Sequence, residues 1–90
     1  MKNYTLKITG RVQGVFFRAR TKDKAEELDV KGFVRNEEDS SVYIECEGDE
    51  ENLEKFLEWC HKGPEKARVE NVEIKESRPK HYTSFRIERE

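Results

Sequence analysis

The residues best suited to chemistry lie between Gly10 and Arg18, in a segment that contains a second glycine, Gly14. Glycine lets the backbone turn tightly and approach a ligand closely. If a helix begins near Phe17, its first amides have no partner within the helix, and the helix dipole adds partial positive charge there. Such a loop can bind an anion, and the guanidinium of Arg18 can hold two phosphate oxygens at once. The alternative interpretation is a tight strand-to-helix turn with a surface arginine, because two glycines at this spacing are a weak motif.

A second candidate is Asn36, at the end of a strand predicted over residues 32–36. Its amide offers one acceptor and two donors without charge, so it can hold a water molecule in one orientation. If the first helix returns the chain to the sheet beside the first strand, Asn36 ends near the glycine loop. Asparagine is also common where a strand gives way to a turn, and the residue pattern alone favours that ordinary role.

The other reactive residue types have no motif around them. His61 and His81 have no Ser or Cys partner at an interpretable spacing, and there is no dinucleotide-binding or Walker motif. Cys46 and Cys60 do not have the spacing of metal ligands, so we interpret them as small core side chains in a reducing, cytoplasmic environment. Whether these two cysteines lie close enough to pair stays open at this point.

Charge is distributed unevenly along the chain. Residues 1–35 hold 9 Lys and Arg against 4 Asp and Glu, whereas residues 36–62 hold 2 against 10. An anionic ligand is therefore expected in the first third, and the acidic block is interpreted as solvated surface. The net charge of -2 does not favour a nucleic-acid-binding protein. No apolar stretch approaches the roughly 20 residues that span a membrane, and no signal peptide is recognisable.

Ninety residues allow one domain, 1–90, and their patterning predicts its elements. These are a strand over 4–12, a helix from 17 to 28, strands over 32–36 and 42–47, a helix from 49 to 62, a strand over 69–74 and an optional short strand over 84–87. The βαββαβ order predicts an α+β, ferredoxin-like split βαβ sandwich: a four-stranded antiparallel sheet with both helices on one face. Gly10 predicts a bend, the break in alternation at residues 70–71 predicts a bulge, and Asp49 is a suitable N-cap.

These segments resemble a known family. Residues 10–18, Gly-Arg-Val-Gln-Gly-Val-Phe-Phe-Arg, closely resemble the first motif of the acylphosphatase family. Residues 32–36, followed by Val42 and Gly48, resemble its second motif. Residues 63–64, 67–69 and 85–87 are also similar, so the resemblance covers nearly the whole chain.

The resemblance implies a small hydrolase that splits acyl phosphates into a carboxylate and inorganic phosphate. It implies that Arg18 binds the phosphoryl oxygens with the backbone amides of the loop, and that Asn36 positions the attacking water. The loop residues concerned are Val12, Gln13, Gly14, Val15, Phe16 and Phe17. The resemblance implies no cofactor, no metal and no covalent intermediate. We expect a cytoplasmic monomer that acts on a small molecule and binds neither nucleic acid nor membrane.

The chain departs from the family pattern at Asp29 and Ser40, where glycine is usual. Both residues cost backbone strain if their φ angles are positive. Neither position coincides with the implied catalytic residues, so stability is affected more than activity.

Two other functional hypotheses fit the same fold. The first is a module that has kept the phosphate site and binds an anion without turnover. The second is an RNA-recognition module, which has the same topology and displays aromatic side chains on its third strand. In this chain the outward positions of that strand are Tyr43, Glu45 and Glu47, and the two carboxylates argue against RNA.

Overall fold

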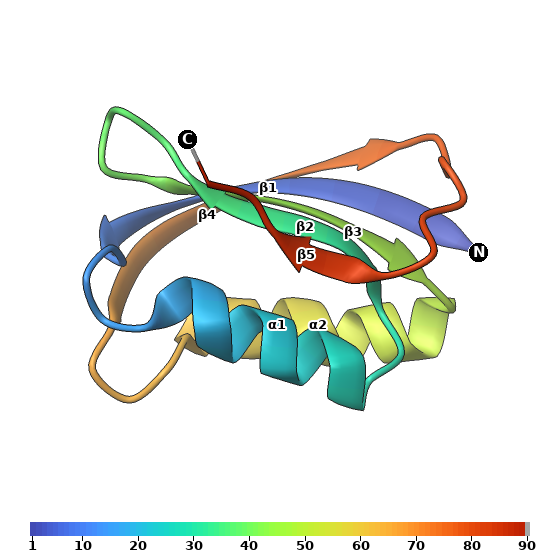
Figure 1. Cartoon of the computed structure of the whole chain (residues 1–90), viewed down its shortest axis with the longest axis horizontal. Coiled ribbons are helices and arrows are strands. Elements are labelled where there is room, and N and C mark those ends of the chain that lie inside the picture. The colour runs from blue at the N-terminus through green and yellow to red at the C-terminus, as the bar shows by residue number, and fades with distance from the viewer. Residues whose placement is uncertain (90) are drawn as a thin grey trace.

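The computed structural model describes residues 1–89, which form one sheet with two helices packed on one of its faces (Figure 1). In chain order the elements are β1 (Lys2–Arg11), α1 (Phe17–Glu27), β2 (Lys31–Asn36), β3 (Val42–Gly48), α2 (Glu50–Lys62), β4 (Arg68–Ser77) and β5 (Phe85–Ile87). The predicted ferredoxin-like βαββαβ fold is confirmed, together with the short fifth strand. No helix in this part of the chain is long and apolar enough to cross a membrane.

The order of the sheet is β4-β1-β3-β2-β5. The first four strands pair antiparallel, and β5 pairs parallel with β2. The expectation that β2 lies beside β1 is wrong, because β3 lies between them. Since β1 and β2 are each antiparallel to β3, they run in the same direction, and β5 follows β2. The carboxyl ends of β1, β2 and β5 therefore lie along the same edge of the sheet.

The core lies between the sheet and the helices, as the apolar spacing predicts. Helix α1 buries Phe17, Thr21 and Ala25, and α2 buries Leu53, Phe56 and Cys60. They pack against alternate residues of the strands, among them Leu6, Ile8, Val34 and Ile44. Cys46 and Cys60 are both buried and free, which agrees with their interpretation as small core side chains. Burial raises the pKa of the Cys46 thiol to about 12, so this thiol is unreactive.

A bulge interrupts the pairing of β1 with β4 at the position where the sequence predicts one. Thr9 pairs with Asn71 and Gly10 pairs with Val69, so Glu70 is the extra residue. Gly10 has φ 127°, and a Cβ there would lie 2.1 Å from the carbonyl oxygen of Arg68. Glycine is required at this point because the backbone of β4 approaches so closely.

Three local predictions concern the ends of elements. Asp29 and Ser40, which replace the usual glycines, have φ angles of 56° and 76°, so both are in the left-handed region. Asp49 does lie at the N-cap position of α2, but its side chain forms no capping hydrogen bond. The predicted N-cap position of Asp49 is therefore confirmed, whereas its side chain does not supply the usual capping contact.

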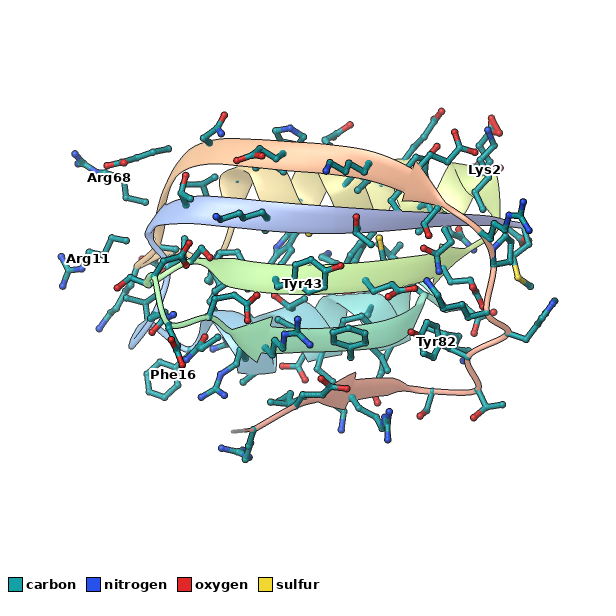
Figure 2. The ribbon with its side chains drawn as sticks, turned by 90° about the horizontal axis from the view of Figure 1, so that it is seen from above. Lys2, Arg11, Phe16, Tyr43, Arg68 and Tyr82 are labelled. Carbon is teal, nitrogen blue, oxygen red and sulfur yellow. The ribbon has the colours of Figure 1, made fainter. Side chains whose placement is uncertain are left out.

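The face of the sheet opposite the helices is partly covered by residues 78–84, which cross from β4 to β5 (Figure 2). Beneath this segment, the side chains of Glu45 and Glu47 on β3 are buried, with whole-residue exposures of 5% and 1%. The interpretation of the acidic block as solvated surface is wrong for these two carboxylates. The alternation of apolar and polar residues in β3 assigns both carboxylates to the face opposite the helices. It does not reveal that a later segment of the chain covers part of that face.

The buried carboxylates are held by hydrogen bonds on several sides. The side-chain amide of Asn3 donates to Glu45 Oε2 at 3.1 Å and to Glu47 Oε1 at 3.0 Å. The backbone N–H groups of Lys80 and Tyr82 both donate to Glu47, and the Lys80 ammonium donates to Glu45. We call these five residues the open-face clamp. They fasten the segment that leads into β5.

Candidate active site

A pocket of about 300 Å³ opens at the sheet edge where β1 and β2 end and α1 begins. The residues that line it are Val12, Gln13, Gly14, Phe16, Phe17, Arg18, Ala19, Asn36, Ile87 and Arg89. The pocket therefore brings together Arg18 and Asn36, the two polar side chains that the sequence singles out. Their elements are distant in sequence but end at the same edge because β1 and β2 run in the same direction.

The start of α1 presents unpartnered amides to this pocket. The helix begins at Phe17, and Phe16 before it has φ 61°, in the left-handed region. Within the described residues, no side chain caps this end of the helix and its first turn contains no acidic residue. The first amides and the positive end of the helix dipole are thus available to an external anion.

Gly14 leaves space for a ligand above the loop. Its φ is 73°, and no heavy atom outside its own neighbourhood lies within 4 Å of the position that a Cβ would take. An anion can therefore approach the backbone here without meeting a side chain. Gly10, the other glycine of the motif, does not line the pocket and instead accommodates the bulge against β4.

The loop is tied down at both ends by its own side chains. Val15 and Phe17 are buried in the core, so only their backbones can face a ligand, and Val15 does not line the pocket. The side-chain amide of Gln13 donates to the carbonyl oxygens of Glu37 and Ser41, each at 2.9 Å. Gln13 therefore fastens the loop to the turn that follows Asn36. Sequence reasoning places Gln13 in the loop but gives no sign of this contact.

The side-chain polar groups of Arg18 and Asn36 are available to a ligand as far as residues 1–89 are concerned. Neither side chain forms a hydrogen bond or an ion pair with another residue in the described part of the chain. Both are half-buried, which limits the range of orientations open to them. None of the described lining residues is acidic and two, Arg18 and Arg89, are basic, so the formal charge of the lining is positive. In residues 1–89, no three His, Cys, Asp or Glu side chains gather in a group that could hold a metal ion.

Sequence reasoning misses three lining residues: Ala19, which follows Arg18 in α1, and Ile87 and Arg89 at the end of the chain. The last two are the distant ones. They reach the pocket because β5 pairs parallel with β2, with Val34 opposite Ile87. The N–H of Glu88 donates to the carbonyl of Val34 at 2.9 Å, which continues this pairing. The register then brings Arg89 level with Asn36. The apolar pattern of residues 85–87 predicts a strand but not its partner, so no local signal reveals the contribution of this segment.

Comparison with known proteins identifies the family of the chain. The model of the acylphosphatase family matches residues 4–87. An acylphosphatase from Thermotoga maritima is 46% identical over 87 residues, or 97% of each chain. One from Salinibacter ruber is 52% identical over 73 residues, or 81% of this chain and 77% of its own. The crystal structure of acylphosphatase from Bacillus subtilis has a TM-score of 0.95 and 33% identity, covering 99% of this chain and 100% of that one. In sequence and in structure, the chain belongs to the acylphosphatase family.

Proposed function

We propose that the pocket hydrolyses the carboxyl-phosphate bond of acyl phosphates, with Arg18 and the loop amides binding the phosphoryl group and Asn36 holding the water. One observation carries the proposal: Arg18, Asn36 and the uncapped start of α1 line a single pocket. Family membership supports the reaction. The roles of the individual residues rest on the arrangement of the pocket.

The phosphoryl group is held by groups that carry or donate positive charge. The backbone amides from Val12 to Phe17 and the fork of Arg18 surround the phosphoryl oxygens, whose charge is redistributed as the bond breaks. Because these donors are already in place and have no partner among residues 1–89, little reorganisation is needed at the moment of reaction. Positioning and charge stabilisation are the main requirements of phosphoryl transfer.

Asn36 orients the nucleophile. Its side-chain oxygen accepts a hydrogen bond from a water molecule and thereby points an oxygen lone pair of that water toward phosphorus. The water oxygen bonds to phosphorus while the bond from phosphorus to the acyl oxygen breaks. The carboxylate leaves with that electron pair, and the proton lost by the water passes to phosphate or solvent. A carboxylate is a weak base, so it leaves without a general acid, and no covalent intermediate forms.

The cellular setting belongs to the same proposal. The chain acts as a cytoplasmic monomer on small acyl phosphates, releases inorganic phosphate, requires no cofactor and binds no nucleic acid. The net charge of -2 and the two free buried cysteines support this setting. Size-exclusion chromatography with light scattering tests the monomer directly.

The test is hydrolysis of benzoyl phosphate in the presence of a metal chelator. The parent protein is expected to turn the substrate over, and Arg18→Ala and Asn36→Ala are each expected to lower kcat/KM by about 10²–10³ or more. Circular dichroism and thermal unfolding check that both variants keep the fold. Near-normal rates in both variants would refute the residue assignment. A parent that binds phosphate without turnover would support the anion-binding module instead.

A further inference from the structure

Phe16 is the feature of the pocket that the proposed reaction leaves unused. Its exposed fraction is 76%, although apolar side chains of this size are usually buried. Its φ of 61° is also uncommon for a bulky residue. Figure 2 shows the ring outside the ribbon, at the edge of the molecule toward which β2 points. The ring lines the pocket that contains Arg18 and Asn36.

The left-handed backbone and the neighbouring residues determine where this ring points. Phe17, the next residue, is buried and packs against Trp59 with ring centroids 6.0 Å apart. The loop therefore fixes one aromatic ring in the core and holds the other in solvent. Ile87, delivered by β5, adds a partly buried apolar side chain to the same pocket. The pocket thus has an apolar part in addition to its phosphoryl-binding part.

An acyl phosphate has a phosphoryl group and an acyl group, and these two groups match the phosphoryl-binding part and the apolar part of the pocket. If the phosphoryl group is bound by the amides at the start of α1, attack in line with the leaving group directs the acyl group away from the water. The loop amides and the helix occupy the inner side, so the acyl group extends toward the mouth of the pocket. Phe16 and Ile87 are the large apolar side chains among the residues that line it, apart from the buried Val12 and Phe17.

We propose that Phe16, together with Ile87 of the same pocket, forms an acyl-group subsite that favours acyl phosphates with a planar, apolar acyl group such as an aromatic ring. This inference rests on the proposed function for the placement of the phosphoryl group. The Phe16 ring covers one face of the acyl group, and the contact removes apolar surface of both from water. A small acyl group such as acetyl is too short to gain from this contact.

The experiment compares benzoyl phosphate with acetyl phosphate for the parent and for Phe16→Ala. The variant is expected to lose about three- to tenfold more in kcat/KM on benzoyl phosphate than on acetyl phosphate, the range of one aromatic contact. A loss through the loop backbone would lower the two rates equally. Phe16→Tyr keeps the ring and is expected to retain the parent selectivity. Ile74→Thr is the matched control, because it removes an exposed large apolar side chain of β4, at 39% exposure, that does not line the pocket.

The same comparison is made by calorimetric titration with benzoylphosphonate and acetylphosphonate, which contain a direct carbon–phosphorus bond and are not hydrolysed. The parent is expected to bind the benzoyl compound more tightly, and Phe16→Ala is expected to abolish that preference. Equal losses on both compounds, or no loss on either, would overturn the subsite. A parent that binds selectively but does not turn over acyl phosphates would support the subsite and overturn the proposed function.

Discussion

The pocket and the open-face clamp lie toward opposite ends of the sheet, and they use similar groups in opposite ways. In Figure 2, Phe16 marks the first region and Tyr82 the second. At the clamp, the backbone N–H groups of Lys80 and Tyr82 converge on the carboxylate of Glu47. His81 between them has φ 62°, which curves the backbone into an anion-binding nest. At the pocket, no carboxylate of the described residues caps the amides at the start of α1.

Arginines show the same division. Arg35 Nε donates to Glu37 Oε2 at 3.1 Å, and Arg35 Nη1 lies 3.7 Å from Glu88 Oε1. The central carbon of its guanidinium lies 4.8 Å from the ring centre of Tyr43. Arg18 has no comparable partner within the described chain. The difference shows how the molecule separates stability from binding. Polar groups that are satisfied internally hold the fold, whereas those left unsatisfied at a half-buried edge are available to a ligand.

The strongest test of this separation is a pair of arginine variants. Arg18→Ala is expected to lower kcat/KM on benzoyl phosphate by about 10³ or more while leaving the free energy of unfolding nearly unchanged. Arg35→Ala is expected to do the reverse, with near-parent kinetics and a loss of about 1 kcal/mol of stability. Kinetics and urea unfolding on both variants measure the two effects. A large loss of stability in Arg18→Ala would break the comparison.

The next largest effect is expected at the clamp. Glu47→Gln should destabilise the fold by about 2 kcal/mol, because the new amide nitrogen cannot accept from the backbone N–H groups that Glu47 satisfies. Urea unfolding at pH 7 measures the loss. Thr5→Ala on β1, outside the clamp, serves as a control for mutation on this sheet. An unchanged midpoint in Glu47→Gln would show that the clamp contributes little.

The dependence on pH sharpens the same test. Burial by itself raises the pKa of Glu47, but hydrogen bonds from Asn3 and from the backbone of residues 80–82 outweigh it, so the pKa is lowered. The stabilisation is therefore present above the ordinary value of 4.5 and is lost as the pH falls through the lower folded-state value. The stability gap between parent and Glu47→Gln is expected to narrow as the pH falls below about 4.5. Glu45 and Lys80 are the other acidic and basic side chains of the clamp. A constant gap would contradict the role assigned to the Glu47 charge.

The smallest expected effect concerns a residue that belongs to neither region. Ser40 has φ 76° in the turn between β2 and β3. Glycine there relieves strain of about 1–2 kcal/mol but costs about 0.5–1 kcal/mol in unfolded-chain entropy. Ser40→Gly is therefore expected to gain about 0.5 kcal/mol in stability with unchanged kinetics. Thermal unfolding measures the gain, and a destabilised variant would mean that the serine side chain contributes more than its backbone strain costs.

The sequence predicts well what short-range patterns control. Neighbouring residues in the chain are enough to predict the buried faces of α1 and α2 and the bulge near residue 70. They are also enough to predict that Arg18 follows a glycine-containing loop at the start of a helix. Features that depend on distant pairing do not follow. Arg89 reaches the pocket through a strand partner that no local pattern specifies, and Glu47 is buried by a segment more than thirty residues away.

The parallel pairing of β5 with β2 has a consequence for the order of folding. All of β3, α2 and β4 lie between these two strands in the sequence. The pairing of β5 with β2 therefore closes a long loop, and because loop closure costs conformational entropy, we expect it to form late in folding. A chain in which the first four strands and both helices have formed still has an incomplete wall beside Asn36. Catalytic competence should consequently appear after the bulk of secondary structure during refolding, so that recovery of turnover reports the docking of the last strand.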